Sequence, residues 1–325
     1  MRRLIVLLLA VCQLPIPAKA SPIRWVDFTL TAEVMNLALQ EDIRTLDEEQ
    51  HLNWLDILAV AAARTGGKCT AESIKKAIQD LKSGDLPPEE FLGDLAKYYR
   101  YYREAYQGAL GGLVGSYEIE VNGKWVGQYG LKAFSPIAAG YGYSHFDDFG
   151  TGRNFGFRRK HLGNDLMGSA GTPITAVEGG VVEAMGWNRY GGWRVGIRSF
   201  DSRRYYYYAH LQKDVPFAPG LAEGDMVEAG DFIGLMGRTG YSDRENVNNI
   251  EVNHLHFGLE LVFDESQKDC NSEIWIDVYE IVKLLSTHRS SLIKENGSWR
   301  RAYPFRDLDV SDYPRVTVNT VKVLS

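Results

Sequence analysis

Two short motifs in the second half of the chain combine side chains that bind metal ions. His161 and Asp165 are four residues apart, and His254 and His256 are separated by one residue. Because alternate side chains of a β-strand face the same side, His254 and His256 are expected to project together. A catalytic zinc ion needs three protein ligands of N, O or S type and one open position, and two histidines with one aspartate meet that need. The motifs therefore predict one shared zinc site.

A further histidine, His210, ends a tyrosine-rich run. Taken singly, these residues also have plainer interpretations. The two motifs could be hydrogen-bonded histidines without a metal, and His210 could be a packed core residue. Tyr208 is expected to share the strand face of His210, where it either orients a substrate or only packs.

The order and surroundings of these motifs resemble the M23 peptidase family, also called the lysostaphin or LytM family. The resemblance covers about residues 155–262 and predicts an antiparallel β-sheet catalytic domain. The segments that carry it are residues 159–165, 171–174, 179–182, 208–211, 224–227, 229–234, 237–240 and 254–257.

The resemblance implies a role for each of the five residues. His161, Asp165 and His256 would hold Zn²⁺, and His210 and His254 would be the catalytic pair. One of that pair takes a proton from the zinc-bound water, and the other hydrogen-bonds the tetrahedral intermediate. Such a role suits an imidazole that titrates near neutral pH. The sequence does not assign the two roles between them.

Two parts of the chain depart from the family pattern. Residues 241–253 insert a polar, Asn-rich stretch before the His-x-His motif, and we expect it to form a longer wall of the substrate groove. The region before residue 110 resembles no domain that we can name. It could position the enzyme on the cell wall, block the groove or serve as a structural partner.

Hydrophobic spacing predicts helices before residue 110 and strands after it. The expected helices cover about residues 37–46, 52–63, 70–81 and 88–109, and a glycine-rich linker follows at 108–115. The last helix carries five tyrosines, which either pack between helices, the interpretation we prefer, or form a stacking platform for sugar or peptide.

After the linker, Asn122-Gly123 predicts a tight β-hairpin, because this pair tolerates positive φ angles. Further strands are expected at 180–184, 193–197, 205–211 and 316–323, and a helix at 274–285. The predicted fold is α+β. Its parts are a signal peptide (1–20), a helical domain (21–110), a linker with the hairpin (111–150), the catalytic domain (151–290) and a C-terminal tail (291–325).

The N-terminus has the order of a secretory signal peptide. Arg2 and Arg3 precede a short apolar run, and Ala18-Lys19-Ala20 forms a small-residue cleavage site. Cleavage after Ala20 predicts an extracytoplasmic protein, secreted or in the cell envelope, that starts at Ser21. The alternative is lipidation at Cys12, whose surroundings loosely resemble a lipobox.

Charge, apolar runs and cysteine content limit the possible binding partners, membrane spans and disulfides. Loss of the signal segment would change the formal net charge from -6 to -9, and no Lys/Arg cluster suggests nucleic acid or an anionic membrane as a partner. No later apolar run is long enough to span a membrane. Cys69 and Cys270 remain after cleavage, either as a disulfide or as two separate thiols.

Three hypotheses for function follow. The first is a zinc endopeptidase that cuts peptide bonds in peptidoglycan cross-links or stems. The second is an inactive LytM-type scaffold that binds the wall or regulates another hydrolase. The third is a zinc peptidase that acts on other peptides. Inactive relatives have lost ligands or catalytic histidines, whereas this chain keeps all five positions, which favours activity.

Overall fold

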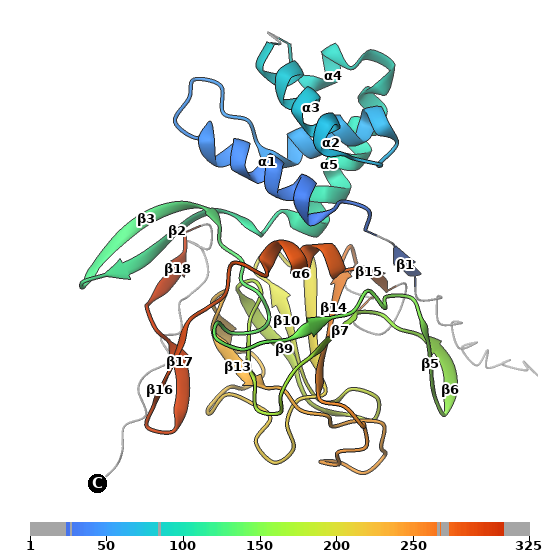
Figure 1. Ribbon diagram of the computed structural model, residues 1–325, viewed down its shortest axis with the longest axis vertical. Helices are drawn as coiled ribbons and strands as arrows, with labels where there is room; N and C mark the ends of the chain where they lie inside the picture. The colour runs from blue at the N-terminus through green and yellow to red at the C-terminus, as the bar shows by residue number, and fades with distance from the viewer. Residues whose placement is uncertain (1–23, 27, 84–85, 265–266, 268–272, 309–325) are drawn as a thin grey trace, which may run out of the picture.

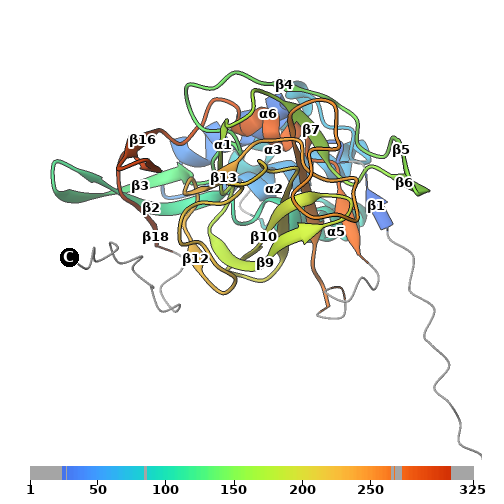
Figure 2. The same ribbon diagram turned by 90° about the horizontal axis from the view of Figure 1, so that it is seen from below.

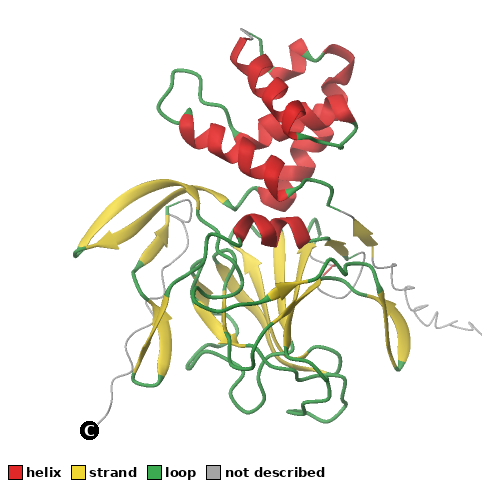
Figure 3. Cartoon of the chain, viewed as in Figure 1, coloured by secondary structure: helices red, strands yellow, loops and turns green. Residues whose placement is uncertain are grey.

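The computed structural model describes residues 24–26, 28–83, 86–264, 267 and 273–308. A helical region lies at one end of the molecule and a β-sheet region at the other (Figure 1; Figure 3). This is the predicted α+β arrangement. In the part of the chain that the structure describes, no helix has the length and apolar content needed to cross a membrane. The predicted signal segment lies outside the described residues.

The helices of the N-terminal region begin and end at capping residues visible in the sequence. Asn53 accepts a hydrogen bond from Leu55 N at the start of α2, and Gly66 ends α2 with φ 63°. The predicted helix at 88–109 is wrong in its first part, because Gly93, at φ 52°, ends the first short helical turn and begins a 3-10 turn that precedes a longer helix. The elements are α1 (Ala32–Arg44), α2 (Trp54–Thr65), α3 (Ala71–Ser83), α4 (Pro88–Phe91), a 3-10 turn (Gly93–Leu95) and α5 (Ala96–Leu110).

The main sheet has the strand order β1-β15-β14-β11-β10-β9-β12, and β7 pairs with both β14 and β4. Its pairs are antiparallel except for β1 with β15. One half of β14 pairs with β7 and the other half with β15, so β14 is central. The strands are β1 (Arg24–Val26), β4 (Ser144–His145), β7 (Asn164–Met167), β9 (Gly180–Asn188), β10 (Gly192–Ser199), β11 (Arg204–Ala209), β12 (Met226–Val227), β14 (His254–Leu261) and β15 (Ile274–Ile276).

The helix expected at 274–285 is wrong in its first part. Ile274–Ile276 is strand β15, and α6 begins only at Tyr279 (Tyr279–Leu285). Two of the three strand residues are isoleucine and the third is tryptophan, types that favour strands, and pairing on both edges outweighs the helical spacing.

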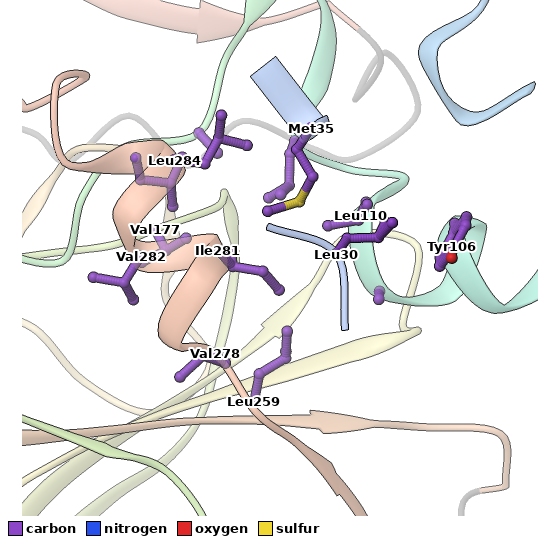
Figure 4. Close-up of a cluster of buried hydrophobic side chains, with 14 of the residues drawn as sticks. Leu30, Met35, Tyr106, Leu110, Val177, Leu259, Val278, Ile281, Val282 and Leu284 are labelled. Atoms are coloured by element: carbon purple, nitrogen blue, oxygen red, sulfur yellow. The ribbon is translucent and has the colours of Figure 1, made fainter. Parts of the chain in front are cut away.

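Helix α6 joins the helical region to the sheet. It lies between them in Figure 1, and Figure 4 shows its apolar side chains facing α1 and the sheet. All members of this cluster are nearly or fully buried, and they belong to one continuous core. The two regions are therefore packed against each other. Members of the cluster include Leu30, Met35, Leu110, Val177, Leu259, Val278, Ile281, Val282 and Leu284.

A buried ion pair closes the junction where a glycine-rich linker was expected. Arg204 is fully buried, and its Nε and Nη2 donate to Glu178 at 2.7 and 3.0 Å. Its Nη1 donates to the carbonyl of Gly108, in the last turn of α5, at 2.9 Å. A Cβ on Gly112 would lie 1.8 Å from Glu178 Oε1. The segment is thus a packed junction.

The predicted hairpin at Asn122-Gly123 is confirmed, with φ of 52° and 75° at the turn. It joins β2 (Val114–Val121) to β3 (Lys124–Leu131), and β18 (Phe305–Asp307) pairs with β2. The segment after Tyr303 therefore contains a strand that the sequence analysis did not predict, and the strand expected at 316–323 lies outside the described residues. Figure 2 shows this hairpin and the β5–β6 hairpin at opposite sides of the molecule. The smaller pairs are β5 (Gly152–Phe155) with β6 (Phe157–Lys160), β8 (Pro173–Thr175) with β13 (Phe232–Leu235), and β16 (Leu292–Glu295) with β17 (Ser298–Arg301).

The tyrosines of α5 divide between packing and exposure. Tyr99 and Tyr106 are buried, as the packing interpretation requires, whereas Tyr98 and Tyr101 are exposed. Cys69 is half-buried, and Cys270 lies outside the described residues.

Candidate metal centre and active-site groove

The three predicted ligands converge at the start of β7. Asp165 and His256 are paired directly across β7 and β14, and His161 lies just before β7. His161 Nε2 is 2.7 Å from His256 Nδ1 and 3.0 Å from Asp165 Oδ1, which is 3.4 Å from His256 Nδ1. Gly163 allows this approach, because a Cβ there would lie 2.5 Å from Phe257 O and 2.9 Å from the His256 ring. The structure brings the three side chains into one cluster, and their role as ligands remains a prediction.

The donor set fits a zinc ion. The three ligand atoms lie within 4.8 Å of one another. Tetrahedral ligands at about 2.0–2.1 Å from zinc are separated by roughly 3.3 Å, so little movement is needed. Asp165 Oδ1 is buried and has no hydrogen bond of acceptable geometry to any residue that the structure describes. A buried carboxylate oxygen in that state requires a positive partner.

The histidine tautomers are set by neighbouring carbonyl groups. A carbonyl oxygen only accepts hydrogen bonds, so an Nδ1 beside it carries the hydrogen and Nε2 keeps its lone pair. Two of the four site histidines are held in this way. The pairs are His210 Nδ1 with Thr239 O at 2.9 Å and His254 Nδ1 with Val252 O at 2.9 Å. His161 Nδ1 has mixed neighbours, with the acceptor Asp148 O at 3.1 Å and the donor Arg153 Nη2 at 3.0 Å.

His210 and His254 flank the candidate ligands. Their ring centroids are 4.7 Å apart, and the His210 ring is 5.9 Å from that of His256. His254 Nε2 lies 3.7 Å from Asp165 Oδ1. Both predicted catalytic histidines thus lie beside the metal cluster.

The expectation that Tyr208 shares the face of His210 is wrong. Strand β11 ends at Ala209, and His210 has φ 61°, so the strand alternation stops before it. Tyr208 is fully buried, and its hydroxyl accepts a hydrogen bond from Val177 N at 2.8 Å. Tyr207 faces the groove instead. Tyr208 is therefore a packing residue.

Burial and mutual charge shift the pKa values of the cluster in opposite directions. Burial favours the neutral carboxyl group of Asp165, but the adjacent imidazoles of His161 and His256 lower its pKa well below the usual range. Burial opposes a charge on His161, yet Asp148 and Asp165 raise its pKa to about 9. Burial lowers the pKa of His256 to about 4 and that of His210 well below its ordinary value. His210 is therefore uncharged at neutral pH.

Sequence reasoning missed Arg153, on the β5–β6 hairpin. Its Nη2 donates to Asp165 Oδ2 at 2.9 Å and also to Asp148. Arg153 thus neutralises the carboxylate at Oδ2, and the same Nη2 atom lies 3.0 Å from His161 Nδ1. No local pattern signals this contact, because it depends on how the hairpin folds over the sheet.

The cluster lies in a groove of about 650 Å³ whose walls come from the hairpin and strands β9, β10, β11 and β14. Of the inserted residues 241–253, all described, only Tyr241 lines the groove; the prediction of a longer wall holds for that residue alone. Asn246 instead accepts a hydrogen bond from Trp193 Nε1 at 2.9 Å. The side chains that line the groove include Arg153, Arg159, Tyr190, Arg194, Tyr205, Tyr207, Tyr241, Glu260 and Trp275.

The fold and the cluster define an antiparallel β-sheet domain with a candidate metal centre at one end of a groove. Residues 159–269 match the model of peptidase family M23. This segment is an M23 peptidase domain, as the sequence motifs predict.

Named relatives match a part of the chain. The chain is 41% identical over 130 residues to the L-Ala–D-Glu endopeptidase of Bacillus subtilis (strain 168), which covers 40% of this chain and 38% of that protein. It is 35% identical over 119 residues to lysostaphin of Staphylococcus simulans. This match covers 36% of this chain and 20% of lysostaphin. The chain therefore spans well under half of the length of either relative.

One solved structure matches most of the fold. The structure from Ruminococcus gnavus assigned as a glycyl-glycine endopeptidase lytM has a TM-score of 0.54 and 21% identity. The match covers 81% of this chain and 90% of that chain, so the helical region followed by an antiparallel sheet is shared.

Proposed function

We propose that this protein is a zinc-dependent endopeptidase that hydrolyses peptide bonds in the cross-links or stems of peptidoglycan. The observation that carries the proposal is the convergence of two histidines and an aspartate, flanked by two more histidines, in the groove of an M23 peptidase domain. The named relatives, an L-Ala–D-Glu endopeptidase and lysostaphin, support a wall peptide as the substrate.

His161, Asp165 and His256 would hold the zinc ion through Nε2, Oδ1 and Nδ1. When bound, zinc lowers the pKa of a coordinated water and polarises a carbonyl group. Two oxygens of Asp148, at 3.1 and 3.2 Å from His161 Nδ1, favour the tautomer that offers Nε2, and Arg153 holds the second oxygen of Asp165. These two residues orient the ligands.

His210 and His254 together supply proton acceptance and the hydrogen bond to the tetrahedral intermediate. Thr239 O fixes the hydrogen of His210 on Nδ1, so its Nε2 is an acceptor. His254 presents its own Nε2 beside the cluster and contacts the other side of the reacting carbonyl. The two rings are close enough for both to contact one tetrahedral centre.

Digestion of purified sacculi tests the proposal. The zinc-loaded protein is expected to release peptide fragments whose masses identify the cleaved bond. Protein from which a chelator has removed the zinc is expected to release none. A chain that binds sacculi without cutting them, with zinc present, would support the inactive scaffold. Cutting of unrelated peptides but not of sacculi would support the third hypothesis.

We also propose the predicted division of the chain and its export. Residues 1–20 act as a signal peptide, 21–110 as a helical domain, 111–150 as the connection, 151–290 as the catalytic domain and 291–325 as a C-terminal segment. N-terminal sequencing of the exported protein is expected to begin at Ser21. A start at a lipid-modified Cys12 would replace secretion by membrane anchoring.

A further inference from the structure

Two arginines in the groove each have one guanidinium nitrogen without a hydrogen bond to any residue that the structure describes. Arg194, on β10, and Arg159, on β6, both line the groove. The Nη1 atom of each is buried without a hydrogen bond, and neither guanidinium has a carboxylate within ion-pair distance among the residues that the structure describes. Buried charged donors without partners are costly, so each favours an anionic ligand.

The strand register places Arg194 level with the candidate metal site. His256 on β14 is opposite Ala209 on β11, and Val195 on β10 is opposite Tyr208, so Arg194 continues the same row. Two strand spacings separate it from His256, which is roughly 10 Å. One residue of an extended peptide spans about 3.3 Å, so a substrate side chain within a few residues of the cleaved bond reaches Arg194.

Arg159 closes the same part of the groove from the hairpin. It is opposite Arg153 across β5 and β6, a pairing of like charges that costs free energy. Arg153 is neutralised by Asp148 and Asp165, whereas Arg159 lies over the rings of Tyr190 and Tyr241, at 4.7 and 5.1 Å from their centroids. These stacked contacts hold the guanidinium in place and leave its charge uncompensated.

Apart from Asp165, the acidic side chains of the groove lie elsewhere. Glu183 pairs with Arg198, and Glu260 is opposite Tyr205, itself opposite Arg198. Glu273 directly precedes Ile274, which is opposite Leu261. This row is four residues along the strands from the Arg194 row, or roughly 13 Å. Charges from Arg194 and Arg159 both act on Tyr207, where they oppose the rise in pKa that burial causes. The two arginines therefore make one cationic region beside the metal site.

We propose that Arg194 and Arg159 form a carboxylate-binding subsite that makes the groove selective for peptides with an acidic residue close to the cleaved bond. The subsite rests on the proposed endopeptidase function and specifies its substrate. A planar guanidinium binds a carboxylate through two parallel hydrogen bonds, and exclusion of water strengthens them. A peptide that is neutral at this position leaves both donors unpartnered.

The test compares two synthetic stem peptides that differ in one group. One carries the free α-carboxylate of D-glutamate, and the other carries its amide. The zinc-loaded chain is expected to cleave the acidic peptide with a kcat/KM roughly 10- to 100-fold higher, the range for a lost charge-assisted hydrogen bond. Arg194→Gln is expected to remove this preference by lowering cleavage of the acidic peptide. Arg203→Gln, which removes an exposed arginine outside the groove, is the matched control and keeps the preference.

Binding separates failure of the subsite from failure of the endopeptidase. Calorimetry on zinc-loaded His210→Ala protein, with and without Arg194→Gln, measures affinity for both peptides without cleavage. Equal affinity for the two peptides overturns the subsite, whether or not the chain cuts sacculi. A carboxylate preference that needs Arg194 supports the subsite even if no peptide is cut, in which case the endopeptidase proposal fails alone. If Arg194→Gln does not fold, Arg159→Gln on the hairpin takes its place and is expected to reduce the preference for the acidic peptide over its amide. An unchanged preference in that variant overturns the proposal.

Discussion

Replacement of Arg204 by methionine is expected to destabilise the whole protein strongly. The variant leaves the Glu178 carboxylate, which is 7% exposed, with the Tyr206 hydroxyl at 2.6 Å as its remaining side-chain donor. It also removes the hydrogen bond to the Gly108 carbonyl at 2.9 Å. Loss of one partner of a buried ion pair typically costs about 3–5 kcal/mol, and Asp201 adds little because its side chain is 40% exposed.

Urea denaturation of four proteins provides the assay. Parent, Arg204→Met, Glu178→Gln and the double variant form a cycle that isolates the coupling between the two side chains. The double variant no longer buries an unpaired charge. Its loss in free energy of unfolding is therefore expected to be about 2 kcal/mol smaller than the summed losses of the two single variants. Arg300→Met, which breaks a fully exposed pair with Glu295, is the control and is expected to leave stability unchanged. This expectation would be refuted if Arg204→Met lowered the free energy of unfolding by less than about 1 kcal/mol, or if the effects of the two single variants added up to that of the double variant.

Three further predictions concern the site and the pH dependence of folding. Asp165→Ala is expected to abolish zinc binding, and full zinc occupancy by elemental analysis would reject the ligand set. His210→Ala is expected to keep zinc and the parent melting temperature but to lower turnover of sacculi roughly a hundredfold; parent-like turnover would remove His210 from the mechanism. Burial and the charge of Asp231 raise the pKa of Glu228 to about 7, so its contribution to stability is present below its ordinary pKa of 4.5 and is lost as pH rises through about 7. Glu228→Gln is therefore expected to gain roughly 2 kcal/mol relative to the parent between pH 5 and pH 8 in urea titrations, and parallel pH profiles would contradict this.

The part of the site that the sequence predicts is the part set by local geometry. Strand alternation relates His254 to His256, and the two-residue turn at Asn122-Gly123 needs only the φ preferences of those residues. The order of the motifs then led to His161 and Asp165. None of these inferences depended on knowing which strands pair.

The parts that sequence reasoning missed depend on tertiary contacts. Ile274–Ile276 becomes a strand because β14 and β1 lie on its two sides, and α5 begins late because Gly93 takes a positive φ. His210 leaves the strand pattern through its own positive φ, which no spacing rule indicates. Arg153 and Arg194 reach the groove through a folded hairpin and a strand register, both set far from the motifs.

Strand β1 covers the outer side of β15 at one edge of the main sheet. Arg24–Val26 pairs with β15, which would otherwise present a row of free backbone groups at the edge of the sheet. An uncovered edge strand can recruit the same strand of another molecule. Removal of the chain up to Val26 would expose the unpaired backbone groups of β15 and leave every site residue in place. Such a protein is expected to keep its peptidase activity and to lose its solubility.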